Sequence, residues 1–209
     1  SGSMGVRVSG DTLFASVWHF TVENGVTSEA WLVALDRRTG RELWRTTLPN
    51  PRGGTVFAAP ALTDRAVVLA VSSGRVAAVD RATGQPVWTF EPPLVRSPSS
   101  QAEADADAVY ADGGDGFVYA LEPATGAVKW KAPFPTQTSH DIVVSARRVY
   151  APMGYYLYIF DRETGRQVAA LSQPGATAER GSLFSSPVAV SASRVFATVD
   201  RGAWSFDEP

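Results

Sequence analysis

The sequence predicts an all-β fold, a β-propeller of four-stranded antiparallel blades with about five blades and an incomplete last one. A phrase made of short alternating runs recurs four times, and a clipped fifth copy, Ala-Trp-Ser-Phe-Asp-Glu-Pro, ends the chain at 203–209. The acidic residues of the five copies are spaced by 44, 42, 39 and 46 residues, and they are Asp36, Asp80, Glu122, Asp161 and Asp207. A period of this length, filled with short strands, is typical of a radial β array.

Composition limits the possible chemistry. The 209 residues carry a formal net charge of −2, which gives no strong field for nucleic acid or for an anionic membrane surface. The chain contains no cysteine, so disulfides, thiolate metal sites and cysteine nucleophiles are excluded. No apolar run approaches the roughly 18 residues that a membrane-spanning helix needs. We therefore expect no nucleic-acid partner and no membrane insertion by this part of the chain.

The repeat divides the chain into one domain at 5–209. Residues 1–4, Ser-Gly-Ser-Met, resemble a cloning remnant, and we expect them to lie outside the fold. In the second repeat, strands are predicted at 60–63, 66–71, 76–79 and 86–90, separated by turn-forming residues. The blades are expected at approximately 5–50, 51–92, 93–133, 134–173 and 174–209, with second strands at 13–17, 109–111, 149–151 and 195–199.

The turn before each fourth strand has a physical explanation. Its carboxylate can accept hydrogen bonds from backbone N–H groups within the turn, and its glycine supplies the positive φ that closes the hairpin. A tryptophan follows the carboxylate by eight residues in three repeats, and such a ring can wedge between neighbouring blades. These structural positions are Asp36, Gly40, Trp44, Asp80, Gly84, Trp88, Glu122, Gly126, Trp130, Asp161 and Gly165.

The pattern Ala-x-Asp-x-x-Thr-Gly-x-x-x-Trp resembles the tryptophan-docking motif of the pyrroloquinoline-quinone-like β-propeller repeat family. The resemblance covers nearly the whole chain and implies four-stranded blades around a channel. The family includes sensor domains of bacterial Ser/Thr kinases, the lipoprotein scaffold of the outer-membrane barrel-assembly machinery, and quinoprotein alcohol dehydrogenases. Three departures stand out: Ala169 replaces the fourth tryptophan, Glu122-Pro123 replaces Asp-Arg, and the fifth repeat stops before any Thr-Gly.

The strand count leaves ring closure open. Four full repeats are followed by one of three strands, and the first repeat starts directly on the inner strand at 6–8. The chain is therefore either a five-bladed propeller with a short last blade or a piece of a larger one. An open ring exposes an unpaired edge, which soluble proteins avoid, so closure with five blades is the favoured prediction.

A binding site is expected on the face where the loops between blades converge. The segment 18–30 is far longer than its counterparts, which indicates either an added functional loop or an extended hairpin that covers the rim. Cations and aromatic rings around a channel mouth could bind an anionic or sugar-like ligand, or a protein partner. Alternatively, the loop arginines are simply solvated. The candidate residues are Trp18, His19, Arg52, Arg96, His140, Tyr155 and Arg180.

Catalytic and metal signals are weak. His19 and His140 are the only histidines, which excludes a histidine-rich metal site. No Gly-x-Ser-x-Gly elbow or phosphate-binding loop is present. The acidic stretch 103–107 lacks the spacing of a calcium-binding hand, so we expect one carboxylate to line the channel and no bound metal. No catalytic residue and no cofactor are predicted.

These observations lead to three hypotheses. The preferred one is a non-catalytic, ligand- or protein-binding propeller, which the resemblance places outside the cytoplasm as a sensor domain of a larger bacterial protein such as a Ser/Thr kinase. The alternative is a protein–protein scaffold resembling the barrel-assembly lipoprotein. A fragment of a quinoprotein dehydrogenase is a remote third, because that family uses more blades, a calcium site and often a vicinal disulfide.

Overall fold

The protein is built entirely of β-sheets in the residues that its computed structural model describes, which are 2–21, 27–48, 59–71, 74–94, 102–133, 142–153, 156–172, 188–191, 194–199 and 202–207. Five antiparallel sheets follow one another along the chain, four with four strands and the last with three. In each sheet the strand order follows the chain order, as in a meander. None of the described residues forms a helix long and apolar enough to cross a membrane.

The strand bounds follow the predicted repeat. The first two sheets contain β1 (Gly2–Ser9), β2 (Thr12–Thr21), β3 (Thr27–Asp36), β4 (Glu42–Leu48), β5 (Ala61–Leu62), β6 (Ala66–Ala70), β7 (Val76–Asp80) and β8 (Pro86–Phe90). The other three contain β9 (Ala102–Ala104), β10 (Val109–Asp112), β11 (Phe117–Leu121), β12 (Val128–Pro133), β13 (Val143–Val144), β14 (Arg148–Met153), β15 (Tyr156–Asp161), β16 (Gln167–Ser172), β17 (Ala189–Val190), β18 (Arg194–Val199) and β19 (Gly202–Asp207). The predicted all-β fold of four-stranded blades with an incomplete last blade is confirmed.

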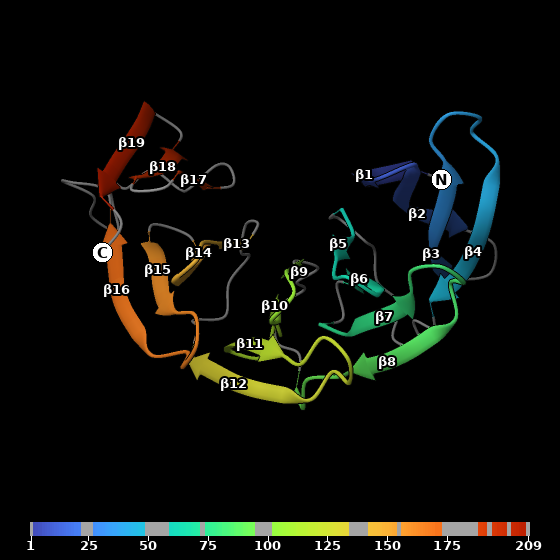
Figure 1. Ribbon diagram of the computed structural model, residues 1–209. Coiled ribbons are helices and arrows are strands. Elements are labelled where there is room, and N and C mark those ends of the chain that lie inside the picture. Colours follow the sequence, from blue (N-terminus) through green and yellow to red (C-terminus); the bar gives the residue numbers. More distant parts are fainter. Residues whose placement is uncertain are drawn as a thin grey trace.

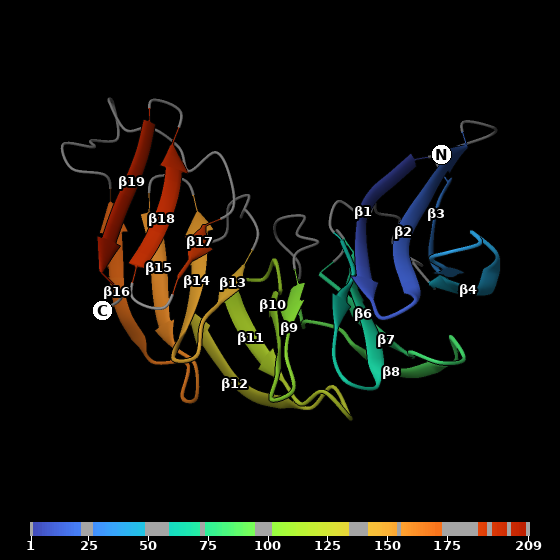
Figure 2. The same ribbon diagram turned by 45° about the horizontal axis from the view of Figure 1, so that its top comes forward.

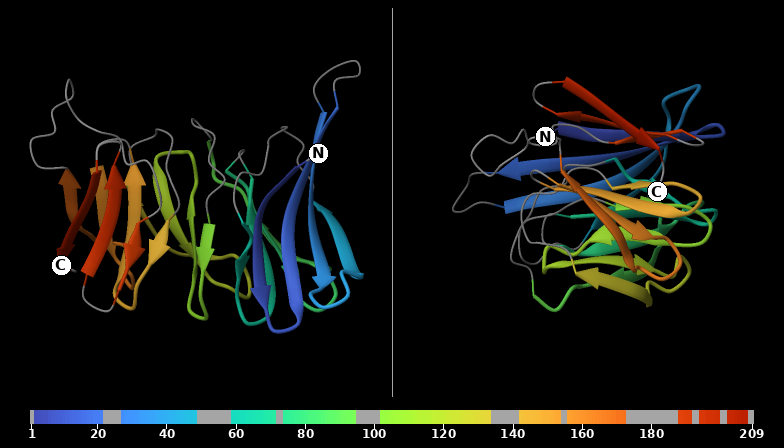
Figure 3. Two further views of the ribbon diagram at one scale, coloured as in Figure 1. Left: turned by 90° about the horizontal axis from the view of Figure 1, so that it is seen from above. Right: turned by 90° about the vertical axis from the view of Figure 1, so that its left-hand side faces the viewer.

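The sheets are arranged radially. In Figure 1 the first strand of each sheet lies toward the centre, and β4, β8, β12 and β16 form the outer rim. The tilted view in Figure 2 shows the sheets standing side by side, and the edge-on view in Figure 3 shows their strands crossing the thickness of the disc. The apolar core of each sheet therefore packs against its sequence neighbours, as the repeat predicts.

The core consists of layers between adjacent sheets. Strand residues alternate between the two faces, so Val67 and Leu69 pack toward the first sheet, while Val68 and Ala70 pack toward the third. Every residue of β6 is buried, because this strand has a sheet on both sides. Continuous apolar strands of this kind indicate burial on both faces, and alternating strands indicate burial on one.

In the second, third and fourth sheets, the turn before the fourth strand lies against the tryptophan of the preceding sheet. The Asp80 carboxylate accepts from the backbone N–H groups of Ala82 and Thr83 at 3.1 and 2.8 Å. Gly84, which ends this turn, has φ +72°, and the Trp44 ring lies so close that a Cβ at Gly84 would be 2.7 Å from it. The indole N–H groups of three tryptophans donate to the turn of the next sheet: Trp44 to the Arg81 carbonyl at 3.1 Å, Trp88 to the Pro123 carbonyl at 2.8 Å, and Trp130 to the Arg162 carbonyl at 2.9 Å.

One local expectation was wrong, and one of two alternatives was decided. Residues 2–4 belong to β1, in which Gly2 and Ser3 pair with Trp18 and Val17, because a longer β2 offers them backbone partners. The described parts of the segment 18–30 form an extended hairpin, the second of the two predicted alternatives. Trp18 pairs with Ala30, and the ladder continues to Thr21 and Thr27. The two strands pair with each other beyond the sheet and so satisfy their own backbone groups.

The five sheets form an open arc rather than the favoured closed ring. Figure 1 shows the first sheet and the β17–β19 sheet at opposite ends of this arc, with the sheets between them following one curve. The side chains agree, because Val6 and Val8 at one end are 48 and 50 % exposed, and Phe196 at the other end is 46 % exposed. The rotation between neighbouring sheets is set by their packing, and the four such steps between five sheets leave both ends uncovered.

Candidate functional site

Most of the predicted site residues lie outside the described part of the chain. This applies to Arg52, Arg96, His140, Tyr155 and Arg180. Trp18 and His19 lie in β2, where they pair with Ala30 and Glu29 of β3. Beside Tyr155, the ring of Tyr156 is exposed and lies 6.0 Å from the ring of Tyr158. The ligand site on the loop face therefore stays a prediction.

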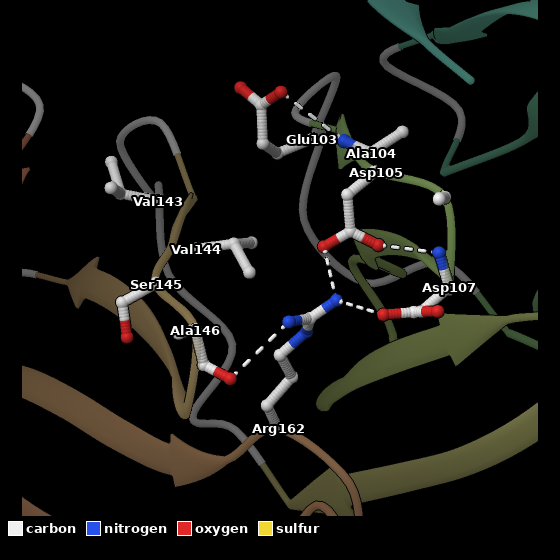
Figure 4. Close-up of a pocket in the computed structure, with 10 residues that line it drawn as sticks. Glu103, Ala104, Asp105, Asp107, Val143, Val144, Ser145, Ala146 and Arg162 are labelled. Carbon is white, nitrogen blue, oxygen red and sulfur yellow. Dashed lines mark hydrogen bonds and ion pairs between the residues drawn. The ribbon is translucent and has the colours of Figure 1, made fainter. Parts of the chain in front are cut away.

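A different site appears between the third and fourth sheets. A cavity of about 420 Å³ opens there, lined by the β9–β10 turn, the β13–β14 turn and Arg162. Figure 4 shows the Arg162 side chain reaching from the end of β15 toward the carboxylates of the β9–β10 turn. The lining residues are Glu103, Ala104, Asp105, Ala106, Asp107, Val143, Val144, Ser145, Ala146 and Arg162.

Arg162 is the central residue of this site. One of its terminal nitrogens lies 2.8 Å from Asp105 Oδ2 and 2.6 Å from Asp107 Oδ2. The other donates to the Ala146 carbonyl at 3.3 Å, and Nε donates to the Tyr110 hydroxyl at 3.0 Å (Figure 4 shows all but the last contact). Its own carbonyl accepts from Trp130, so one residue ties together the backbone and side-chain contacts between two sheets.

Burial and charge pull the Arg162 pKa in opposite directions. Burial lowers it, while the hydrogen bond to Tyr110 and the charges of Asp105 and Asp107 raise it, and the net shift is upward. Burial also raises the pKa of Tyr110, against the hydrogen bond from Arg162, which lowers it. Both groups therefore keep their protons at neutral pH. The pair is suited to hold a fixed hydrogen-bond geometry, and it offers no group ready to exchange a proton.

The remaining carboxylates of the cavity are also engaged. Glu103 forms an ion pair of 2.8 Å with Arg7, which comes from the first sheet. Asp105 Oδ1 accepts from the backbone N–H groups of Asp107 and Ala108 at 2.8 and 3.0 Å, so it closes its own turn. Three carboxylates thus face two arginines. The cavity is polar and slightly acidic, which suits a small neutral or cationic group better than an anion.

No metal centre is evident in the described ranges. No three His, Cys, Asp or Glu side chains among them lie close enough together to hold a metal ion. The Asp112–Gly116 turn illustrates why its carboxylates serve structure. Asp112 is buried and accepts from the Gly114 N–H at 2.8 Å, while Asp115 accepts from the Tyr119 hydroxyl at 2.6 Å. Burial, followed by this hydrogen bond, raises the pKa of Tyr119.

The inter-sheet cavity was not predicted from the sequence, although a signal for it exists. An arginine directly follows the turn carboxylate in three repeats, and an aromatic residue recurs in the second strand. The structure pairs these positions across the sheet boundary. Arg81 lies over the Phe14 ring at 5.4 Å from its centroid, just as Arg162 reaches Tyr110. The repeated arginine–aromatic pair is thus part of how neighbouring sheets recognise each other.

Comparison with known proteins identifies similar chains of differing activity. The Ser/Thr protein kinase AfsK of Streptomyces griseus is 34% identical over 137 residues, which are 62% of this chain and 17% of the kinase. The quinohemoprotein alcohol dehydrogenase of Comamonas testosteroni is 30% identical over 155 residues, which are 63% of this chain and 22% of that enzyme. The chain therefore spans less than a quarter of the length of either relative.

A solved structure supports the same fold. The crystal structure of BamB from Moraxella catarrhalis matches with a TM-score of 0.68 at 22% identity, covering 98% of this chain and 58% of that one. Such a likeness establishes the propeller architecture alone. A family profile described as outer membrane protein assembly factor BamB matches residues 1–184, most of the repeat array. The chain belongs to this family of pyrroloquinoline-quinone-like propeller repeats.

Proposed function

We propose that the chain is a non-catalytic, protein-binding propeller module that acts outside the cytoplasm. The match of residues 1–184 to the outer membrane protein assembly factor family supports a protein partner. The charged side chains of the inter-sheet cavity support the absence of catalysis, because they are already bound to one another. We expect the propeller to bind its partner through the shape of its surface and through backbone hydrogen bonds.

The observation that carries protein binding is the outer rim. The first two outer strands present an exposed aliphatic residue at the β-bulge just before their tryptophan, namely Leu43 and Val87, and the third presents the exposed Val128 one position earlier. A single exposed aliphatic residue is common, but exposed aliphatic residues close to the bulge of three successive outer strands form an apolar edge. These strands lie at the edge of their sheets, where an added strand of a partner can pair with the backbone.

Selection from a phage-displayed peptide library against the immobilised chain tests this proposal. We expect extended peptides with alternating apolar residues, whose binding weakens at least about tenfold in Val87→Lys. Tyr156→Lys is the matched control, because Tyr156 is also exposed but lies on β15, the third strand of the fourth sheet, and not on an outer edge strand. Peptides that bind Val87→Lys as well as the unchanged chain contradict a role for the rim.

The absence of catalysis has its own test. Pyrroloquinoline quinone and calcium are titrated into the chain, and a dye-linked assay follows alcohol oxidation. We expect neither saturable binding of the quinone nor turnover. Turnover in this assay would favour the dehydrogenase alternative, which the similarity to the Comamonas enzyme keeps relevant.

A second candidate function is a sensor domain that binds a small anionic or sugar-like ligand. The similarity to the AfsK kinase over 62% of this chain favours it. The proposed contacts are those of the loop face, namely Trp18, His19, Arg52, Arg96, His140, Tyr155 and Arg180. Thermal-shift titration with inorganic phosphate, citrate and glucose tests it, with the triple variant Arg52→Ala, Arg96→Ala, Arg180→Ala as control. A shift of equal size in both chains contradicts an arginine-lined ligand site.

A further inference from the structure

The arginine–aromatic pair between the first and second sheets lies beside a cavity of about 570 Å³. The corresponding cavity between the third and fourth sheets, beside Arg162 and Tyr110, measures about 320 Å³. Both are lined by the turn before a fourth strand and by the second strand of the preceding sheet. We call the larger one the Arg81 cavity, and its polar and aromatic lining residues are Thr12, Phe14, Asp64, Arg65, Asp80 and Arg81.

The two arginines differ in what their guanidinium groups bind. Each donates from one terminal nitrogen to a backbone carbonyl of its own sheet, at 3.3 Å for Arg162 and 3.4 Å for Arg81. The other terminal nitrogen of Arg162 lies 2.8 and 2.6 Å from the carboxylates of Asp105 and Asp107 (Figure 4). Among the described residues, Arg81 forms no ion pair, and its guanidinium lies 5.4 Å from the centroid of the Phe14 ring.

The first sheet lacks the carboxylate pair that binds Arg162. Ser9 begins the β1–β2 turn as Asp105 begins the β9–β10 turn, so an uncharged hydroxyl replaces the first carboxylate. Asp11 stands at the position of Asp107, but in the described part of the chain its carboxylate forms no ion pair. The guanidinium of Arg81 is therefore left with donors that no described carboxylate accepts.

The carboxylate next to Arg81 also lacks a partner that its counterpart has. In the fourth sheet, Asp161 Oδ2 lies 3.2 Å from Arg148. The residue at the position of Arg148 in the second sheet is Ala66, which pairs with Asp80 across the strands. Asp80 Oδ1 accepts the hydrogen bonds of its own turn, and Oδ2 accepts none from the described residues. The Arg81 cavity thus offers guanidinium donors and a carboxylate acceptor together.

We propose that the Arg81 cavity binds the acidic side chain, Glu or Asp, of an extended segment of a protein partner. The carboxylate of this side chain takes the place that two aspartates take on Arg162, where the guanidinium fork suits a carboxylate. Backbone N–H groups of the same segment donate to Asp80 Oδ2, and Thr12 adds a hydroxyl donor to the lining. This inference rests on the function proposed above, because it names the chemistry of the partner.

The charges of the lining select a singly charged group. The positive charges of Arg65 and Arg81 are balanced by Asp64 and Asp80, which line the same cavity. A phosphate carries more than one negative charge at neutral pH, and both aspartates repel the excess. A side-chain carboxylate on a polypeptide brings one negative charge together with backbone donors for the aspartates, so it matches both halves of the lining.

The test titrates acetyl-Gly-Glu-Gly-amide into the 209-residue chain and follows NMR chemical shifts. We expect saturable shifts of the Thr12 and Ala82 amides and of the Arg81 side-chain Nε–H, and none with acetyl-Gly-Gln-Gly-amide. Arg81→Gln should weaken binding at least about tenfold, because it removes the charged donors. Arg166→Gln is the matched control, since it removes the same charge from an exposed position and should change binding by less than about twofold.

A second variant fills the cavity from within the chain. Ser9→Asp places a carboxylate at the position of Asp105, so we expect it to compete for Arg81 and to weaken peptide binding at least about tenfold. Its thermal midpoint should not fall, because the new carboxylate repeats a contact that the fourth sheet already makes. Loss of binding in a chain of undiminished stability separates occupation of the cavity from unfolding.

Three results overturn the inference. The Glu and Gln peptides bind alike, or the Glu peptide binds Arg81→Gln or Ser9→Asp as it binds the unchanged chain. Inorganic phosphate binds as tightly as the Glu peptide, which indicates a general anion site. Propionate, which is the Glu side chain alone, binds as tightly as the peptide, which indicates a free carboxylate as the ligand.

Failure of this inference is distinct from failure of the proposed function. The rim is tested by Val87→Lys, and Val87 does not line the Arg81 cavity. Selected peptides that bind Val87→Lys normally contradict the rim, whatever the Glu peptide does. Shifts with the Glu peptide that do not depend on Arg81 contradict the cavity, whatever the rim binds.

Discussion

Glycines at turn positions have two roles in this fold: they adopt a left-handed backbone, and they leave space for a tryptophan ring. Comparison of Gly40 with Gly126 separates these roles. Gly40 and Gly126 share nearly the same backbone, with φ +73° and +71°. A Cβ at Gly126 would lie 2.6 Å from Trp88 Cε3, whereas a Cβ at Gly40 would meet no described atom. A left-handed backbone alone therefore explains Gly40, while Gly126 also provides a surface for the indole.

Substitution by alanine separates the two contributions. Gly40→Ala should cost about 1 kcal/mol, the price of a side chain in the left-handed region. Gly126→Ala should cost about 3 kcal/mol or more, because the same strain is joined by displacement of the Trp88 ring. Urea unfolding measures both free energies. Equal losses in the two variants would mean that the Trp88 contact contributes little to stability.

The turn carboxylates couple folding to pH. Hydrogen bonds from the Thr83 hydroxyl and then from its backbone N–H hold the pKa of Asp80 below its usual value of 3.8. A carboxyl with a lowered pKa in the folded state adds stability above its unfolded pKa, and loses it as the pH falls through the folded pKa. The pKa values of Asp36 and Asp161 are lowered by hydrogen bonds from Thr39 and Thr164 in the same way.

We therefore expect the unfolding free energy to decrease as the pH drops below about 4. Asp80→Asn should make this decrease shallower, because the amide oxygen keeps the acceptor and the titrating charge is gone. Chemical unfolding between about pH 3 and pH 7 measures the slope. An unchanged slope in Asp80→Asn would assign the acid sensitivity to other groups.

At the scale of the elements, the sequence predicts the strands well and their sheet-to-sheet contacts poorly. The second repeat was predicted at 60–63, 66–71, 76–79 and 86–90, within two residues of β5 to β8. Turn residues and apolar alternation act locally, so they are visible in one repeat. At 18–30 length alone left a loop and an extended hairpin open, although the alternation of Trp18-His19-Phe20-Thr21-Val22 has the period of a strand and favours the hairpin.

The inter-sheet cavity was missed because its parts come together only after folding. Arg162 meets Tyr110 and Asp107 across 52 and 55 residues of sequence. The candidate residues of the loop face were also predicted from loops that converge in space, but only from the composition of those loops and not from a pair of residues that recurs in each repeat. The arginine after the turn carboxylate and the aromatic residue of the second strand recur in the sequence, and their repetition was the usable signal.

Arg162 should contribute more to the free energy of unfolding than its positive charge alone would. It joins two sheets through Tyr110, Asp105, Asp107 and the Ala146 carbonyl, and its side chain is 18% exposed. Arg162→Ala leaves a buried hydroxyl and a carboxylate without this partner, so we expect a loss of about 2–3 kcal/mol. Arg166→Ala removes the same charge from an exposed position of the same turn and should change stability by less than about 0.5 kcal/mol. Similar losses from both variants would reduce the role of Arg162 to net charge.

At the scale of the molecule, the repeat made the blade count predictable and left ring closure undetermined. Neighbouring sheets are joined by local contacts, namely a tryptophan on a glycine turn at three boundaries and an arginine–aromatic pair at two of them. None of these local contacts determines the number of blades in a ring. Because soluble proteins avoid unpaired sheet edges, the sequence favoured a closed ring of five blades. The structure instead shows an arc, and Val6, Val8 and Phe196 are exposed on its two end faces.

An open array of this kind should unfold from its ends. Stability in a repeat protein is the sum of each repeat and its neighbour interfaces, and the end sheets have one such interface instead of two. β6 and β7 lie between two sheets and are almost entirely buried, whereas β17–β19 form a sheet of three strands with Phe196 exposed. We expect hydrogen exchange under native conditions to be slowest in β6, β7, β10 and β11, and fastest in β17–β19. Exchange at one common rate in all five sheets would show that the arc unfolds as a single cooperative unit, which nearest-neighbour contacts alone do not produce.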